Sequence, residues 1–194
     1  YNVSVLYDSE LFDDDYKMYR KEINKNGYNT EKVYQEFFKT DYRDLQENIE
    51  LIVPDDIDDF KNYIQVKDKF SGKLLDLNNR GAIVSEKLAK IKKIEVGDVL
   101  TIEDVYGNDF DVEISGICEF YLGHYLFMNK DYYETVTGSR YVPNMDLFKF
   151  EDDFYIDKFS KDTIKNKSVM NITDMHDSKV QLNQFLYSIN KVEV

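Results

Sequence analysis

Residues 99–115 read VLTIEDVYGNDFDVEIS, and they show the clearest local pattern in the chain. Apolar side chains alternate with more polar ones on both sides of the dipeptide Gly107-Asn108. A period of two is typical of a strand with one buried face, and a Gly-Asn pair between two such runs favours a tight turn. The stretch therefore predicts an antiparallel hairpin, whose inward positions are Leu100, Ile102, Phe110, Val112 and Ile114.

The remainder of the chain alternates between strand-like and helix-like segments. Runs rich in β-branched and aromatic residues predict strands, and apolar residues at spacings of three and four predict helices. We expect further strands at 2–7, 33–38, 49–53, 81–84, 124–128, 147–150 and 169–172, and a hairpin over 64–77 around Ser71-Gly72. Helices are expected from residue 8 or 9 to 26, at 55–63, after Ser85, at 130–137, at 154–164 and over about 173–190.

Several helix ends carry signals of their own. Asp8 or Ser9 is expected to cap the first helix and Ser85 the third, because short polar side chains accept bonds from free backbone N–H groups. Asn26-Gly27 ends the first helix, since glycine adopts the left-handed conformation found at many helix ends. The expected fold class is α+β, a mixed or mainly antiparallel sheet with packed helices, formed as one domain over 1–194 with a β-rich sublobe near 81–128 or as two lobes.

Composition limits the classes of partner. The chain has 194 residues, 42% of them hydrophobic, with 16 Tyr and 13 Phe, so it can bury a core. Its 38 acidic and 25 basic side chains give a net charge of −13. Nucleic acid and anionic lipid would both be repelled. The excess of acidic side chains either keeps the protein in solution or attracts a cationic partner, and the net charge alone does not decide between these two roles.

Nothing in the sequence predicts a membrane span, since the longest uncharged aromatic run, 120–129, is shorter than the roughly 18–20 apolar residues required. The chain opens in a strand-like stretch without an initiator Met or a signal peptide, so we interpret it as part of a larger protein.

Candidate catalytic groups are few. Cys118 and His124 are the one nearby pair of a nucleophile and a base, but Cys118 shares the parity of the hairpin's inward residues and should be a buried, inert thiol. We expect His124 to pack or to form hydrogen bonds, and His176 to lie at the surface. No phosphate-binding loop or catalytic motif is present, and we expect no cofactor.

Acidic side chains cluster at 13–15, 55–59 and 151–153. They are interpreted as solvated faces or helix caps, with adventitious calcium as the alternative, so no metal site is predicted. A hydrolase with two carboxylates that meet only in space also remains open.

The stretch from Gly81 carries a resemblance to a known family. GAIVSEKLAK (81–90), VGDVLTI (96–102), ISGICE (114–119) and GHYLFM (123–128) resemble the periplasmic-core region of FtsX/MacB-like ABC transporter permeases, in particular those of low-GC Gram-positive bacteria. Pro143-Asn144 also fits the family pattern. Phe120 and Phe127 replace an Asn and a Tyr of that pattern, so a role of that Asn cannot be carried over.

The resemblance implies a MacB-like periplasmic-core fold and a non-enzymatic domain on the outer face of the cell membrane. Its partners would be the membrane helices of the permease and a separate ATP-binding subunit, and its cargo a peptide, a lipid or a lipoprotein. The domain would serve export, gating or mechanical relay. This hypothesis expects the two chain ends to lie close together, because both must meet the bilayer.

Binding residues are not specified by any motif. The first candidates are Tyr121, His124 and Tyr125, since exposed aromatic side chains make good anchors, with core packing as the alternative. The rival function is a free-standing secreted or cell-surface binding module. Hydrophobic spans bordering this region in its gene would favour the permease, and a signal peptide with a wall anchor the rival.

Overall fold

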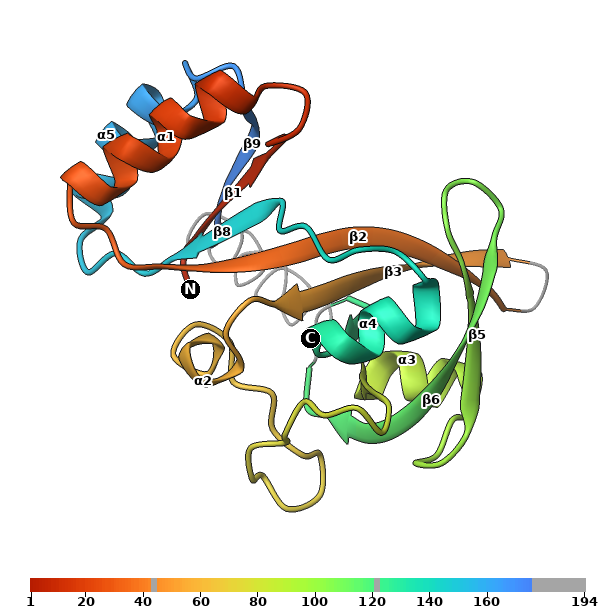
Figure 1. The fold of residues 1–194 in the computed structure, drawn as a ribbon. Helices are drawn as coiled ribbons and strands as arrows, with labels where there is room; N and C mark the ends of the chain where they lie inside the picture. The colour runs from red at the N-terminus through yellow and green to blue at the C-terminus, as the bar shows by residue number, and fades with distance from the viewer. Residues whose placement is uncertain (43–44, 121–122, 176–194) are drawn as a thin grey trace, which may run out of the picture. The chain divides into compact units, whose positions relative to one another are not determined.

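A computed structural model describes residues 1–42, 45–120 and 123–175, and it confirms the α+β class with a mixed sheet. The chain forms two compact units (Figure 1). Unit 1 combines Tyr1–Thr30 with Asn144–Val194, and unit 2 is the intervening Glu31–Pro143. The predicted β-rich sublobe belongs to unit 2, and the expectation of a single domain stays a prediction.

The sheet of unit 1 is built around its first strand. β1 (Val3–Tyr7) lies between β8 (Met145–Phe148) and β9 (Val169–Asp174) and is antiparallel to both. β8 and β9 are therefore parallel to each other, and α5 (Asp153–Thr163) connects them across β1. The helix after β1 is α1 (Asp13–Lys25). α1 and α5 lie side by side against this sheet (Figure 1).

The core of unit 1 combines one face of the sheet with one stripe from each helix. The predicted stripe of α1 is confirmed at Tyr19 and Ile23, which are both buried. The same apolar cluster takes in alternate residues of β1 and the inward residues of α5, because strands and helices bury side chains at periods of 2 and 3.6. Its members are Val3, Val5, Tyr7, Tyr19, Ile23, Phe148, Ile156, Phe159 and Val169.

A buried ion pair joins α1 to β8. Asp146 is fully buried, and its Oδ2 accepts bonds from the Tyr19 hydroxyl, at 2.6 Å, and from the Arg20 guanidinium. Tyr7 and Tyr16 pack over this pair, with their ring centroids 4.8 Å apart. A charge buried in this way is tolerated only while its partners remain, so the pair fixes where α1 lies on the sheet.

Unit 2 contains a ring of strands. Following the hydrogen bonds in the order β3, β7, β4, β6, β5, β2 leads back to β3, so the sheet closes on itself. Parallel pairs, β3–β7 and β4–β6, occur among antiparallel ones, which makes the sheet mixed. The bounds are β2 Thr30–Tyr42, β3 Leu45–Pro54, β4 Ala82–Ser85, β5 Val99–Glu103, β6 Asp109–Cys118 and β7 Tyr125–Phe127.

The predicted hairpin forms one side of this ring. β5 and β6 pair from Val99 opposite Glu113 to Glu103 opposite Asp109. Gly107 in the turn has a φ of 83°, a conformation that glycine adopts without strain. The inward positions Leu100, Ile102, Val112 and Ile114 are buried and Phe110 packs against them, so the predicted orientation is confirmed.

Three helices connect the strands of unit 2. α2 (Ile57–Phe60) is shorter than predicted and is capped by Asp56, whereas α4 (Lys130–Thr137) has the predicted bounds. α3 (Glu86–Lys92) follows β4 and contributes Leu88 and Ala89 to the core.

Two predicted caps are wrong. The carboxylate of Asp8 accepts bonds from Glu10 N and Leu11 N and so closes a separate turn, after which α1 begins at Asp13. Ser85 precedes α3 but makes no side-chain cap, because its hydroxyl accepts the N–H of Tyr125 at 3.0 Å. In both cases a tertiary or turn contact takes the oxygen that the helix would have used.

Two further predictions need correction. Residues 64–77 do not form a regular hairpin: a single bridge joins Lys67 to Leu74. The predicted C-terminal helix starts slightly later than expected, because β9 continues to Asp174 by pairing with β1 and the helix begins at Met175. The rest of that predicted helix lies outside the described residues.

We expect Asp146→Ala to lower the free energy of unfolding by about 3–5 kcal/mol, because it leaves the Arg20 charge partly buried without its partner. Urea denaturation followed by far-UV circular dichroism would measure this. Asp13→Ala is the control, since the Asp13–Lys17 pair is exposed and its loss should change little. Equal effects of the two substitutions would contradict the structural role of Asp146.

Candidate functional site

Of the predicted aromatic candidates, His124 and Tyr125 are described, and Tyr121 lies outside the described residues. The His124 side chain is only 10% exposed, and its Nδ1 lies 3.4 Å from a carboxylate oxygen of Glu47 on β3. Its Nε2 is buried and has no hydrogen-bond partner in the described part of the chain. The burial of the ring agrees with the packing role expected of it.

Tyr125 is half-buried among other aromatic rings. It stacks on Phe127, with ring centroids 6.0 Å apart, and meets Phe120 edge to face at 4.8 Å. Its N–H binds Ser85. A Cβ on Gly123 would lie 2.8 Å from the Tyr125 ring, so glycine is required for this packing. These contacts support β7, and a role in anchoring a ligand stays a prediction.

Cys118 is confirmed as a core residue. It is fully buried at the end of β6, and burial raises the pKa of its thiol to about 12. At neutral pH the group is a protonated thiol and therefore a poor nucleophile. No hydrogen bond links it to His124 in the described ranges, so this pair does not form a catalytic dyad.

The acidic clusters serve helix starts. Asp56 Oδ1 accepts bonds from the amides of Asp58 and Asp59, at 2.9 and 3.1 Å. Asp152 caps α5 by accepting from Phe154 N at 2.9 Å. Asp13 pairs with Lys17 one turn later. Within the described residues, no group of three His, Cys, Asp or Glu side chains is arranged to hold a metal ion.

One acid missed by the sequence analysis is buried. Glu31, at the start of β2, is 3% exposed, and its Oε1 accepts the N–H of Asp56 at 2.8 Å. Burial, together with the nearby carboxylates of Asp59 and Asp55, raises its pKa to about 7. The signal was present in the sequence, because Glu31 has the same parity as the buried Val33 of the same strand.

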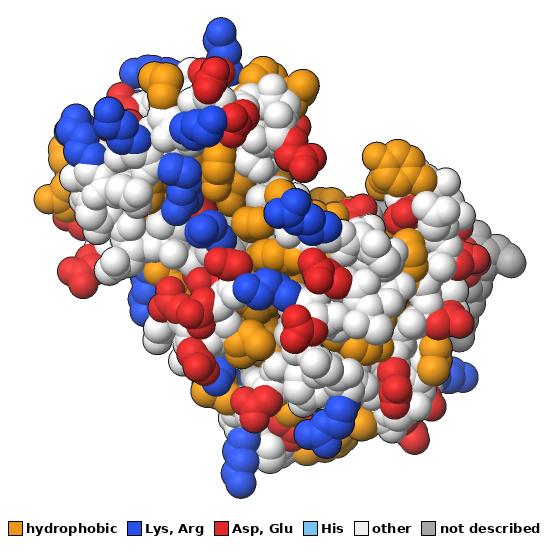
Figure 2. Space-filling model, viewed as in Figure 1, with side chains coloured by type: hydrophobic (Ala, Val, Ile, Leu, Met, Phe, Trp, Pro, Cys, Tyr) orange, Lys and Arg blue, Asp and Glu red, His pale blue; other side chains and the backbone are white. Residues whose placement is uncertain are grey.

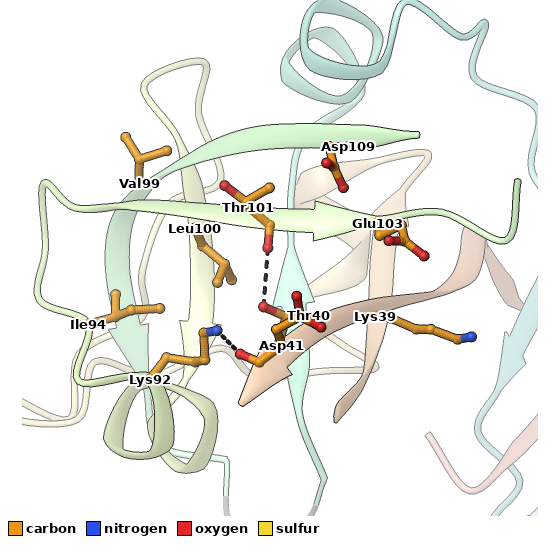
Figure 3. A pocket seen from close by; sticks show the side chains of 10 residues that line it. All are labelled: Lys39, Thr40, Asp41, Lys92, Ile94, Val99, Leu100, Thr101, Glu103 and Asp109. Carbon is orange, nitrogen blue, oxygen red and sulfur yellow. Dashed lines mark hydrogen bonds between the residues drawn. The ribbon is translucent and has the colours of Figure 1, made fainter. Parts of the chain in front are cut away.

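A pocket of about 380 Å³ opens between the end of β2, β5 and the end of α3 (Figure 3). Thr40 Oγ1 donates a bond to the Thr101 carbonyl at 3.1 Å, and the ammonium of Lys92 reaches the carbonyl oxygen of Asp41. No catalytic pattern marks these residues in the sequence. The remaining lining residues are Lys39, Ile94, Val99, Leu100, Glu103 and Asp109.

Unit 1 has a groove of its own between α1 and α5, with a volume of about 450 Å³. Met18 from α1 is 63% exposed at this groove, and the buried ring of Phe159 from α5 lines it. Charged side chains, among them Glu22 and Lys158, complete its lining.

The visible surface mixes charges rather than separating them. In Figure 2 acidic side chains are interspersed with Lys and Arg, and isolated hydrophobic side chains lie among them. Two of the most exposed aromatic side chains occupy loops: Phe70, 81% exposed, and Tyr106, 86% exposed. No helix among the described residues has the length and apolar character needed to cross a bilayer.

No protein-family profile matches the chain, and no curated protein matches it significantly. Solved structures give partial likenesses. The extracellular domain of the noncanonic ABC-type transporter YknZ from Gram-positive bacteria aligns at 16% identity and a TM-score of 0.49, over 88% of this chain and 100% of that domain.

Two other structures align less closely. The periplasmic region of MacB from Actinobacillus actinomycetemcomitans has 13% identity and a TM-score of 0.44, over 94% of this chain and 92% of that one. A Bacillus anthracis protein provisionally called a lipoprotein has 10% identity and a TM-score of 0.44, over 89% and 97%. YknZ and MacB are of the kind that the sequence resembles. The scores are low, so function has to be inferred from the chain's own residues.

Cys118 should resist alkylation by iodoacetamide in the folded protein and react fully in denaturant, because burial keeps it protonated and out of reach. Mass spectrometry of the alkylated protein would measure the modified fraction. Rapid modification of the native protein would show that the thiol is accessible.

Glu31 should make the protein less stable as the pH rises. Its pKa is raised from 4.5 to about 7 on folding, so its stabilising contribution is complete below pH 4.5 and is lost as the pH passes through about 7. We expect a loss on the order of 2 kcal/mol over this range.

The Glu31→Gln variant should remove this dependence and be more stable than the parent at pH 8, because the amide oxygen can still accept the Asp56 N–H without carrying a charge. Urea midpoints between pH 4.5 and 8 would measure this. Glu22→Gln controls for the loss of one exposed carboxylate. Parallel profiles for Glu31→Gln and the parent would contradict the assignment.

Proposed function

We propose that this chain is a non-enzymatic extracytoplasmic domain of an FtsX-like ABC transporter permease, which contributes to export, gating or mechanical relay across the membrane. One observation carries the proposal: the first and last described segments of the chain lie side by side. Val3 on β1 is opposite Asp174 on β9, and Met175 N donates a bond to Asn2 O at 2.7 Å.

Adjacent ends suit a domain that is looped out between two membrane segments. Both connections then leave the same edge of one sheet and can reach the bilayer together. A module that is attached to the cell surface at one end alone does not need its two chain ends to lie close together. The hypothesis expected the two chain ends to lie close together, and the proximity of residues 2 and 175 supports it for the described part of the chain.

The connectivity also suits a relay. Unit 2 is inserted into unit 1 between Thr30 and Asn144, so the first and last described residues, Tyr1 and Met175, both belong to unit 1. The amide of Asn2 binds both N and O of Phe150, at 2.9 and 2.7 Å. Asn166 of the α5–β9 connection donates to the Asp15 carbonyl of α1 at 2.8 Å.

These bonds and the Arg20–Asp146 pair tie the start of the chain, both helices and β8 together. Packed elements move as units rather than deforming continuously. A displacement of the chain ends would therefore move unit 1 as a body and pull on both connections to unit 2.

The resemblance over 81–144 supports the same family. The proposed partners are the membrane helices of the permease and a separate ATP-binding subunit. Peptide, lipid and lipoprotein remain the proposed classes of cargo.

The test is a labelling experiment on the product of the complete gene in a Gram-positive host. Tyr106→Cys places a thiol at an 86% exposed position, whereas the native Cys118 is buried and provides the background control. We expect a membrane-impermeant maleimide to label the variant in intact cells, and the labelled protein to stay in the membrane fraction after a carbonate wash.

Labelling only after lysis would contradict the extracytoplasmic placement. Labelled protein that is released into the medium or with the cell wall would instead support the free-standing surface module.

A further inference from the structure

The ring of strands in unit 2 is incomplete at one seam. β2 pairs with β3 from Val33 opposite Pro54 to Tyr42 opposite Leu45, but it pairs with β5 at a single position, Lys39 opposite Glu103. Continuing that antiparallel register would place Asp41 opposite Thr101. The structure has no such ladder, and the pocket of Figure 3 lies there instead.

The direction in which each N–H and C=O group of β5 and β2 points follows from the ladders that these strands form with β6 and β3. On β5, Asp98 O accepts from Ile114 N and Asp104 N donates to Asn108 O, so even-numbered residues face β6. Because successive residues of a strand point in opposite directions, Val99 and Thr101 direct their N–H and C=O groups away from β6, into the seam.

On β2 the same reasoning applies. Lys32 O accepts from Asp55 N at the β3 side, and the register is continuous, so even-numbered residues face β3. Asp41 therefore directs its N–H and C=O toward β5, and in a complete ladder Asp41 and Thr101 would exchange two hydrogen bonds.

Side chains have taken the two acceptors of that missing pair. Thr40 Oγ1 donates to the Thr101 carbonyl, and Lys92 Nζ donates to the Asp41 carbonyl (Figure 3). Beyond Lys39 and Glu103, β2 and β5 form no further pair in the described part of the chain, so the N–H groups of Asp41 and Thr101 and the N–H and C=O of Val99 belong to no ladder between these strands. Along the edge of β5 that faces the seam, Val99 N–H, Val99 C=O and Thr101 N–H follow one another as donor, acceptor and donor. This is the order found at the edge of an unpaired strand.

We propose that this seam binds an extended peptide segment with basic side chains, which adds to the edge of β5 as a strand. Peptide carbonyls would accept from Thr101 N and Val99 N, and a peptide N–H would donate to Val99 O. An exposed strand edge is a common template for pairing with another chain.

The negative charge of the pocket favours a basic peptide over a free anion as its ligand. Asp41, Glu103 and Asp109 line the pocket, and none of the three forms an ion pair within the described part of the chain. Of the two cations, Lys92 is already bonded to a carbonyl, which leaves Lys39. A peptide backbone supplies neutral acceptors, and its Lys or Arg side chains would meet the three carboxylates.

The seam belongs to unit 2 and depends only on contacts within it, so the inference does not rest on the transporter placement. It is tested on the 194-residue chain with a probe peptide of five alternating Lys and Val residues with blocked ends. We expect millimolar or tighter binding by calorimetry, with amide NMR shifts concentrated at Asp41, Val99 and Thr101.

Two altered probes examine the mechanism without changing the protein. N-methylation of every peptide amide should weaken binding by about tenfold or more, because the peptide can no longer donate to Val99 O. Methylation of alternate amides should leave binding within about threefold, since one edge remains open. Replacing each Lys by Glu should weaken binding by about tenfold through repulsion.

Matched variants locate the site. Thr101→Pro removes an N–H that faces the seam and takes no part in a ladder with β2, and should weaken binding by about tenfold or more. Thr101→Ala keeps that N–H and loses only the side chain bonded to Asp111, so its affinity should stay within about threefold of the parent. Glu103→Lys with Asp109→Lys should also weaken binding, whereas Asp14→Lys, in unit 1, should not.

The proposal is overturned if the Lys-Val peptide does not bind at millimolar concentration, or if the fully methylated peptide binds as well as the parent peptide. Shifts that map away from the seam, or equal affinities for Thr101→Pro and Thr101→Ala, would overturn it as well.

Discussion

Unit 2 depends on the satisfaction of backbone hydrogen bonds around a ring of strands. β2 makes closure possible, because it pairs with β3 along most of its length and touches β5 at Lys39 and Glu103. Each buried N–H and C=O needs a partner, and a ring provides partners without leaving a free edge. Where the ring fails to close, Thr40 and Lys92 cover the carbonyls with side chains, and the exposed donors become available for a ligand.

The residues that carry the family resemblance are largely residues that permit this closure. A Cβ on Gly81 would lie 2.4 Å from the Glu113 carbonyl of the neighbouring strand, so no other residue fits without moving the backbone. Ser85 joins β4 to β7 through its hydroxyl. A motif of this kind identifies an architecture and says little about ligands, because a fold hosts many functions.

Acidic side chains serve two distinct purposes in this protein. Most are exposed, and several, such as Asp56 and Asp152, satisfy amides at helix starts. Among the described residues, Asp146 and Glu31 are the buried exceptions. Asp146 is compensated by Arg20, whereas Glu31 accepts backbone bonds but lies near further carboxylates. The first fixes α1 on its sheet, and the second makes stability depend on pH.

Local structure follows directly from the order of residues. The alternation around Gly107, the stripe of Tyr19 and Ile23 and the bounds of α4 are set by the period of apolar residues and by local turn chemistry, which act over a few neighbours. The inward facing of Cys118 followed from the same period. Long-range packing sets which strands are neighbours, that Ser85 binds Tyr125 rather than α3, and that Asp41 faces Thr101 across an open seam. Those outcomes depend on contacts between residues that are far apart in the chain. Such contacts produce no periodic pattern in the sequence from which they could be predicted.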